Sequence, residues 1–339
     1  MGLYCGIDLH SNNHVVTVID ETDRRLYERR HPNELSLTAS ALEPFRDELV
    51  GVAVESTFNW YWLVDGLMDA GFAVRLVNTA AVQQYSGLKH SDDWHDAFWL
   101  AHLMRLGILP TGYIYPKEQR GIRDLARQRM RLVQHRASHI VSVQNQIWRS
   151  SGVRLDARTI RGERPSVQWP TLPDQYVGMS VEAARAAIDA LGEQIRRLER
   201  TLLSLVKPSP MHERLTTVVG IGPVLALVIA LEIGDIRRFP SPGDFASYCR
   251  LVDSQKTSNN KKKGEANRKN GNPYLAWAFM EAAQVALRYL PEAKRFYERK
   301  RRQRHMILAK KALAHKLARA VYRMLLEEVP FERERLFVA

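Results

Sequence analysis

Four carboxylates stand where the elements of an α/β fold would bring them together. Asp8 lies near the end of the first apolar segment, and Glu55 ends a later one. Asp93 and Asp96 are three residues apart in a helical pattern, so both fall on one helix face. Four clustered acids repel one another unless a cation joins them, and Mg²⁺ or Mn²⁺ prefers oxygen ligands. Such ions activate and stabilise oxygens at a phosphodiester, so the four acids are candidate catalytic and metal-binding residues.

A purely structural explanation competes for the same acids. Carboxylates at the start of a helix are stabilised by the helix dipole by about 0.3–1 kcal/mol each. Asp8 and Glu55 could simply end strands. Asp92 is one step off the face shared by Asp93 and Asp96, so we expect it to cap the helix.

A basic loop in the last third of the chain carries hydroxyls among its cations. The hydroxyls are Thr257 and Ser258. The six basic residues are Lys256, Lys261, Lys262, Lys263, Arg268 and Lys269. Such a loop could grip a nucleic-acid backbone, or it could be a solvated loop. A hydroxyl among cations could also attack phosphorus, because nearby positive charge stabilises an alkoxide and the charge that develops on phosphate.

The pair Gly220 and Gly222 lies between two apolar segments and is similar to a helix-hairpin-helix motif. Glycine allows close backbone approach, and Pro223 marks the start of a helix whose free N–H groups could bind a phosphate. The alternative is a tight turn in a helical core.

The bulk composition favours a polyanionic partner. The chain has 339 residues and a formal charge of +13, and twelve Lys or Arg lie within Lys294–Arg323, as a nucleic-acid-binding or a solvated face. Its two cysteines are far apart and give no metal or disulfide pattern, which fits a reducing compartment. Asp8 interrupts any apolar start, and the longest apolar run, Val224–Leu231, is too short to span a bilayer. We therefore expect a cytoplasmic, nucleic-acid-facing protein without a membrane segment.

The first hundred residues alternate strand and helix patterns. The expected strands are Leu3–Asp8, His14–Ile19, Arg24–Arg30, Val50–Glu55 and Ala73–Val77, and the expected helices are Glu34–Leu49 and Asn59–Ala70. Three strands in a meander, followed by alternating helix and strand, predict a mixed α/β sheet.

The pattern of the rest of the chain predicts helices. A charged helix is expected at 118–148 and an irregular connection at 150–179, after which Ser180 could cap a helix with an apolar heptad seam from Ile188 to Leu205. This pattern favours an antiparallel arm, although the seam could also bind a partner helix. The expected division is an α/β domain at 1–115, a helical arm or coiled coil at 116–210 and an all-helical domain at 211–339. Asn272 and Pro273 predict the start of one of its helices.

Four segments together resemble the DEDD-type transposases of bacterial insertion sequences, a family described as bridge-RNA-guided recombinases and related to Piv-type DNA invertases. The segments are GIDLHSNNHVVTVID, VAVESTFNWYWLVDGLMDAGFAVRLVN, SDDWHDAFWLAHLMRLGILP and VVGIGPVLALVIALEIGDIRRFPSPGDFASYCRLV. The resemblance extends from Gly6 to about Leu290. Each segment alone is a weak signal, but four in this order are specific.

The resemblance implies a RuvC-like, ribonuclease-H-type N-terminal domain in which Asp8, Glu55, Asp93 and Asp96 are the four metal-binding acids. It also implies a C-terminal serine that attacks DNA and forms a covalent phosphoserine link. Matching the family's Ser-Ser-Gly-Gly-Lys back from Gly271-Asn-Pro-Tyr-Leu275 places it on Thr257-Ser-Asn-Asn-Lys261. Ser258 is therefore the expected nucleophile, and Ser254 is the alternative.

Together these observations predict an insertion-sequence transposase or recombinase that cuts and rejoins DNA with Mg²⁺ (or Mn²⁺) and Ser258. The expected partners are donor and target DNA and a structured guide RNA. A homodimer or homotetramer is expected because recombination joins two duplexes. Two alternatives stay open: a metal-dependent, Holliday-junction-resolvase-like nuclease in which the acids alone support hydrolysis, and a nucleic-acid-binding protein without activity whose acids are structural.

Overall fold

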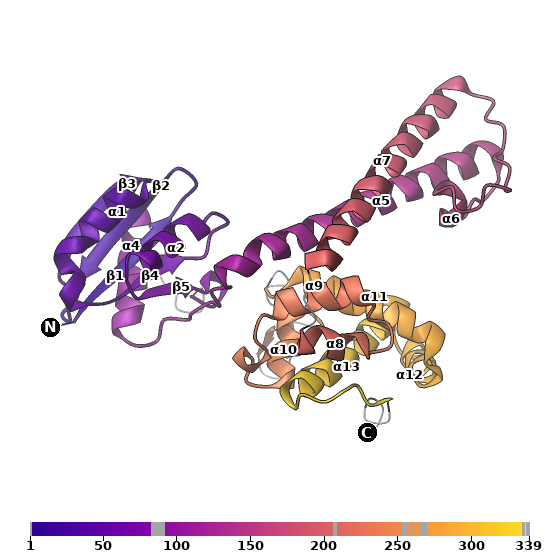
Figure 1. Cartoon of the computed structure of the whole chain (residues 1–339). Coiled ribbons are helices and arrows are strands. Elements are labelled where there is room, and N and C mark those ends of the chain that lie inside the picture. The colour runs from indigo at the N-terminus through magenta and orange to yellow at the C-terminus, as the bar shows by residue number, and fades with distance from the viewer. Residues whose placement is uncertain are drawn as a thin grey trace. The chain divides into compact units, whose positions relative to one another are not determined.

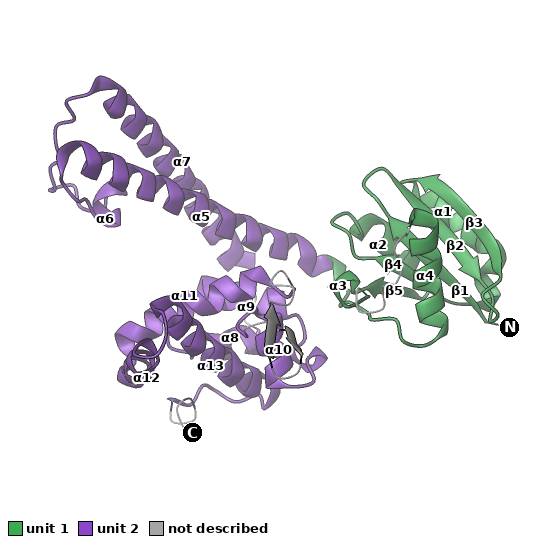
Figure 2. Cartoon of the chain, turned by 180° about the vertical axis from the view of Figure 1, so that it is seen from behind, with its two compact units in different colours: residues 1–117 green, residues 118–339 purple. Residues whose placement is uncertain are grey.

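A five-stranded mixed sheet organises the N-terminal part of the chain (Figure 1). The computed structural model describes residues 2–82, 92–205, 209–252, 256–258, 261–264, 270–333 and 336, with only the backbone at 256–258 and 261–264. The chain divides into two compact units, Met1–Lys117 and Glu118–Ala339 (Figure 2).

The sheet of the first unit has the strand order β3-β2-β1-β4-β5. The strands are β1 (Leu3–Leu9), β2 (Asn13–Ile19), β3 (Arg25–Pro32), β4 (Leu49–Glu55) and β5 (Val74–Val77). The first three form an antiparallel meander, and β4 and β5 run parallel to β1. This arrangement confirms the predicted mixed α/β sheet. The charged residues of β3 suit its place at the sheet edge, where they discourage pairing with another chain.

Helices cover both faces of this sheet. They are α1 (Leu35–Leu42), the 3₁₀ helix η1 (Glu43–Glu48), α2 (Tyr61–Asp69), α3 (Thr79–Val82) and α4 (Asp93–Arg105). Side chains of α1 and α2 share a core with Cys5 and Ile7, whereas α4 packs with Ala53 on the opposite face. The single helix expected at Glu34–Leu49 is wrong, because Pro44 lacks the N–H that an α-helix interior requires and the chain continues there as 3₁₀.

Two long helices begin the second unit, α5 (Lys117–Ser151) and α7 (Gln175–Leu205), with the short α6 (Ala157–Ile160) between them. Arg129 pairs with Glu199, and Ile147 shares an apolar cluster with Val181, so the two helices run antiparallel (Figure 1). The expected helix start at Ser180 is wrong: the helix begins at Gln175 because Asp174 accepts hydrogen bonds from the N–H groups of Tyr176 and Val177 at 2.7 and 3.3 Å.

Shorter helices form the remainder of the second unit. They are α8 (Pro210–Thr216), α9 (Pro223–Ile233), the 3₁₀ helix η3 (Ile236–Arg238), α10 (Pro242–Tyr248), α11 (Pro273–Tyr289), α12 (Pro291–Arg301) and α13 (Met306–Leu326). Phe245, Phe279 and Leu317 are fully buried in their common core. The three-part division of the chain stays a prediction, since the arm and these helices belong to one compact unit.

A two-stranded hairpin corrects the expectation of an all-helical C-terminal segment. Strand β6 (Lys256–Ser258) pairs antiparallel with β7 (Lys261–Gly264), with Ser258 opposite Lys261. The Lys- and Asn-rich composition gave no alternating apolar signal for these strands, because their pairing depends on backbone hydrogen bonds. Among the described helices, none combines the length and apolar character needed to cross a membrane.

Candidate active site

The alternation of side chains along β1 and the pairing of β1 with β4 bring Asp8 and Glu55 together. On β1, Tyr4, Gly6 and Asp8 point to the face covered by α4, because side chains of a strand alternate between faces. The parallel partner strand places Ala53 and Glu55 on that same face, and the register of Ile7 with Val54 sets Asp8 beside Glu55.

Gly6 allows the helix that carries the other two acids to approach the sheet. A Cβ atom at residue 6 would collide with the backbone oxygen of Ala97 and would lie 2.8 Å from the backbone nitrogen of Ala101. Only glycine therefore lets α4 lie this close to β1. The consequence is that the first turn of α4, with Asp93 and Asp96, reaches the carboxyl end of β1.

Asp8, His10 and Asp93 form the centre of the site. Nε2 of His10 lies 3.2 Å from Oδ2 of Asp8 and 3.2 Å from Oδ1 of Asp93. One ligand atom from each of these residues lies within 4.8 Å of the others. Nη2 of Arg30 donates a hydrogen bond of 2.5 Å to Oδ2 of Asp93. The site therefore joins β1, β3 and α4.

His10 is the residue that the sequence interpretation missed. It follows Asp8 by two residues, so a strand that continued to residue 10 would place both side chains on one face. That spacing, with a side chain able to bind a metal, was the available signal. Asp92 behaves as predicted: its side chain caps α4 and accepts a hydrogen bond of 2.8 Å from the N–H of His95.

The acids interact strongly with one another. Burial raises the pKa of Glu55 to about 8, with further contributions from a hydrogen bond to Asp8 and from the charges of Asp8 and Asp96. Asp93 differs, because its hydrogen bond from Arg30 holds the pKa of its carboxyl below the usual range. Asp8 thus belongs both to the group formed with Glu55 and Asp96 and to the group formed with His10 and Asp93.

These residues fit a divalent cation. Oδ2 of Asp8 and Nε2 of His10 are buried atoms whose contact lacks hydrogen-bond geometry, and neither has another hydrogen-bond partner in the described part of the chain. Asp8 itself is only 3 % exposed. Buried polar atoms are usually satisfied, and carboxylate oxygens with an imidazole nitrogen are common donors to divalent metals. A cation would satisfy these atoms and would lower the pKa of Glu55, which burial and the neighbouring acids raise.

The predicted serine lies at the end of β6, where the structure describes the backbone alone. The same holds for Lys256, Lys261, Lys262 and Lys263, so the structure places these residues in the hairpin without their side chains. Ser254, Arg268 and Lys269 lie outside the described residues. The structure does describe both ends of the segment 251–270 that contains the hairpin.

The base of this segment is closed by hydrogen bonds. The backbone N–H of Asn272 donates to the carbonyl of Tyr248 at 2.6 Å, and Nε of Arg250 donates to the carbonyl of Gly271 at 3.0 Å. Gly271 has φ +89°, and a Cβ atom there would lie 2.5 Å from the Tyr248 oxygen. Glycine is therefore required at the point where the two ends meet.

A buried carboxylate connects this base to the arm. Glu232 of α9 is 1 % exposed and accepts hydrogen bonds from Nε and Nη2 of Arg127, on α5, at 2.5 and 2.8 Å. It also accepts a bond of 2.7 Å from Nδ2 of Asn272, whose Oδ1 caps α11 as predicted. Burial opposes the charge of Arg127, but the Glu232 hydrogen bonds outweigh it and raise the pKa of the guanidinium. The guanidinium also lies 4.4 Å above the ring of Tyr274.

The two glycines predicted to bind nucleic acid have different surroundings. Gly220 has φ +101°, and a Cβ atom there would collide with the backbone of Ala282 on α11. Gly222 is the N-cap residue of α9, and nothing lies within 4 Å of the position where its Cβ would be. Gly220 therefore has a packing role, whereas Gly222 leaves the start of α9 open.

Gly220→Ala is expected to destabilise the second unit by about 2–4 kcal/mol, the sum of the left-handed backbone cost and the collision with α11. Gly222→Ala is the control and should change the free energy of unfolding far less. Urea unfolding followed by helical circular dichroism measures both. Equal stability of the two variants would show that the contact between Gly220 and Ala282 is not a tight one.

Two models of insertion-sequence transposase families match different parts of the chain. Residues 5–148 match the DEDD transposase family of IS110, and residues 212–298 match the transposase IS116/IS110/IS902 family. A probable family 20 transposase of Pseudomonas aeruginosa is 26 % identical over 248 residues, covering 70 % of this chain and 71 % of the relative.

Two further relatives are transposases of named insertion elements. The transposase of IS1111A from Coxiella burnetii is 23 % identical, and the match covers 84 % of this chain and 78 % of the relative. The transposase of IS1328 from Yersinia enterocolitica is 24 % identical, and the match covers 80 % of this chain and 82 % of the relative. The chain belongs to the DEDD-type insertion-sequence transposases, enzymes that cut and rejoin DNA.

Proposed function

We propose that this transposase cuts DNA through Ser258 and a metal site built from Asp8, Glu55, Asp93 and Asp96. The observation that carries the metal part is the buried, unsatisfied Oδ2 of Asp8, which lies beside Glu55, a carboxyl whose pKa is raised by burial and by Asp8 and Asp96. Mg²⁺, or Mn²⁺ in its place, is the proposed ion because carboxylate oxygens suit both. A bound cation would offset the charge that develops on the phosphodiester oxygens.

The protein residues would orient this site. His10 is a further candidate ligand, since its Nε2 faces both Asp8 and Asp93. Arg30 would hold Asp93 in its ionised, ligating form through their hydrogen bond. A RuvC-like, ribonuclease-H-type fold is proposed for the first unit, supported by the strand order β3-β2-β1-β4-β5 and by acids at the ends of β1 and β4.

In the proposed cleavage, Oγ of Ser258 attacks phosphorus and forms a Ser–O–P bond. The bond from phosphorus to one sugar oxygen breaks; the serine hydroxyl gives up its proton to solvent, and the leaving sugar oxygen takes up a proton and departs as a hydroxyl. Rejoining is the reverse, in which a hydroxyl from another strand displaces the serine. The basic residues of the hairpin segment would bind the DNA backbone. They are Lys256, Lys261, Lys262, Lys263, Arg268 and Lys269. The start of α9, which Gly222 leaves open, would present free N–H groups to a phosphate.

A structured RNA is the proposed guide, and the enzyme would act on donor and target DNA as a homodimer or homotetramer. The net positive charge of the chain supports nucleic-acid binding in general. Recombination between two duplexes requires more than one active site, which supports an oligomer. The place of action would be the bacterial nucleoid.

Ser258→Ala is expected to abolish the covalent protein–DNA adduct, because alanine has no nucleophilic oxygen. Thr257→Ala removes the neighbouring hydroxyl and is the matched control, which should form the adduct at the wild-type level. The measurement is the amount of detergent-resistant adduct on a DNA duplex that carries the ends of the element, with Mg²⁺ and RNA transcribed from the flanking non-coding DNA.

Other outcomes assign the function differently. If Ser258→Ala cuts DNA at the wild-type rate, the metal-dependent nuclease is the correct function. If Ser254→Ala alone removes the adduct, Ser254 is the nucleophile. Cleavage at the same site without RNA would overturn the guide.

A further inference from the structure

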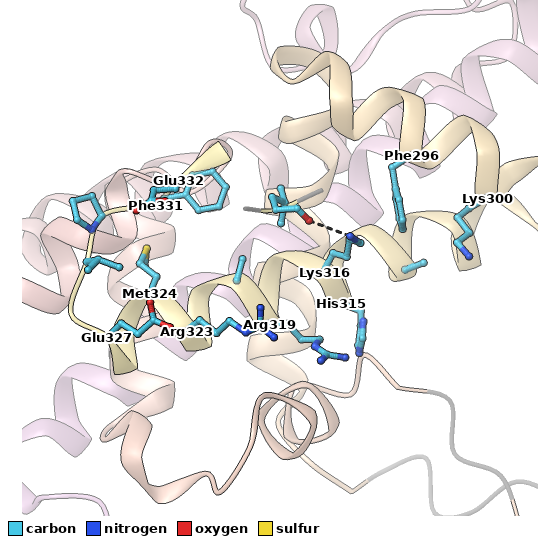
Figure 3. A pocket seen from close by; sticks show the side chains of 15 residues that line it. Phe296, Lys300, His315, Lys316, Arg319, Arg323, Met324, Glu327, Phe331 and Glu332 are labelled. Carbon is cyan, nitrogen blue, oxygen red and sulfur yellow. Dashed lines mark hydrogen bonds between the residues drawn. The ribbon is translucent and has the colours of Figure 1, made fainter. Parts of the chain in front are cut away.

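A pocket of about 740 Å³ lies in the second unit between α12, α13 and the chain that follows α13 (Figure 3). One wall is a single face of α13, from Ala312 to Glu327, at helical spacings of three and four. Ala312 and Ala320 on this wall have small side chains, so the longer side chains around them enclose an open volume. Pockets of this size hold small ligands or one unit of a polymer.

One end of the pocket is cationic. Lys300 of α12 and His315, Lys316 and Arg319 of α13 gather there (Figure 3). Nζ of Lys316 donates to the carbonyl of Leu336 at 3.1 Å. Arg319 and His315 form no hydrogen bond or ion pair with any described residue. Positive charge therefore accumulates at this end without a carboxylate that neutralises Arg319.

The electrostatic effect of this accumulation is visible on two side chains. Burial, with the charges of Arg319 and Lys311, lowers the pKa of His315. Burial, with the charges of Arg299 and Arg319, lowers the pKa of Lys316. Both groups are thus desolvated and repelled by neighbouring cations. An anion bound between them would offset this repulsion and raise both pKa values.

The other end of the pocket is apolar with two carboxylates. Met324 and Phe331 line it, together with Glu327 and Glu332 (Figure 3). The apolar side chains suit the face of a nucleobase, and carboxylates accept hydrogen bonds from the amino groups of bases.

We propose that this pocket binds one unpaired nucleotide of a nucleic-acid strand, with its phosphate against Arg319 and His315 and its base against Met324 and Phe331. None of the residues that line the pocket is one of the four acids, Ser258 or Gly222. The proposal holds whether or not Ser258 is the nucleophile. The phosphate and base are common to DNA and RNA, so the experiment must distinguish these two sources.

The test measures binding of the full-length protein by fluorescence anisotropy. The probes are a labelled DNA single strand of about 12 nucleotides, the RNA strand of the same sequence, and the blunt DNA duplex. Arg319→Ala is expected to weaken single-strand binding about tenfold and to lower the slope of log affinity against log salt by about one. Arg288→Ala removes an exposed charge of α11 that lies outside both the pocket and the basic segment Lys294–Arg323, and it should leave both quantities close to the wild type.

Ala320→Trp is the second variant, because it fills the pocket without changing the charge. It should weaken single-strand binding as Arg319→Ala does, while duplex binding is retained, since a paired nucleotide cannot enter. Loss on the RNA strand alone, the DNA strand alone or both identifies the source of the nucleotide. Equal losses in Arg288→Ala and Arg319→Ala, equal losses on the duplex, or wild-type binding by Ala320→Trp would overturn the proposal.

Discussion

Asp8→Asn is expected to lower the rate of DNA strand cleavage by about 10³-fold. Asp8 interacts with Glu55 and also faces His10, so it links the two groups of proposed ligands. An amide keeps the shape of the side chain but loses the charge and offers one oxygen instead of two. The measurement is the cleavage rate on end-containing DNA at saturating Mg²⁺ or Mn²⁺.

Asp92→Asn is the matched control for this prediction. Its side chain caps α4 through the N–H of His95, and asparagine caps a helix as well as aspartate does. Cleavage by Asp92→Asn should therefore stay at the wild-type rate, although this variant also loses one carboxylate, at the start of α4. Equal losses in Asp8→Asn and Asp92→Asn would show that the general negative charge matters and that Asp8 has no special role.

Thermal unfolding separates a metal-site defect from misfolding. Asp8→Asn removes a charge from a group of acids that repel one another, so the variant should unfold at or above the wild-type temperature without metal. Mn²⁺ should stabilise the wild type by mass action, and Asp8→Asn much less. A variant that is inactive, unstable and still stabilised by Mn²⁺ like the wild type would contradict the assignment of Asp8 as a ligand.

Glu232→Ala should destabilise the second unit by about 3–5 kcal/mol, because it leaves the mostly buried Arg127 and the side chain of Asn272 without their partner. For a unit of this size the expected decrease in melting temperature is about 10 °C. Scanning calorimetry of the full chain measures it.

Glu163→Ala is the control, since its ion pair with Arg161 lies at the surface. It should change the melting temperature by no more than about 3 °C. Glu232→Gln should lie between the two variants, because glutamine can still accept one hydrogen bond. A small effect of Glu232→Ala would mean that the contact between α5 and α9 does not depend on the ion pair.

The sheet could be predicted because its cause is local. β1 and β4 are short, nearly continuous apolar segments, and the alternation of strands and helices predicted that Asp8 and Glu55 end neighbouring strands. The two acids of α4 followed from the helical spacing of Asp93 and Asp96. The depth of the site could not be predicted, because it depends on the distance between α4 and β1 that Gly6 allows.

Other features escaped the sequence because they are set by tertiary contacts. His10 is separated from Asp93 by more than eighty residues and meets it only after β1 and α4 pack. Glu232 looked like an ordinary residue at the end of an apolar helix, and its partners come from α5 and the start of α11. The β6–β7 hairpin was missed because its strands carry no apolar pattern.

The closed base of the segment 251–270 has a consequence for the length of the segment. The hydrogen bonds of Tyr248, Arg250, Gly271 and Asn272 fix where the segment leaves and re-enters the helical core. Residues between these points can be inserted, deleted or exchanged at little cost to that core, because the entropy of closing a longer loop grows slowly with its length. Changes in the length of this segment around the proposed nucleophile are therefore compatible with an unchanged helical core.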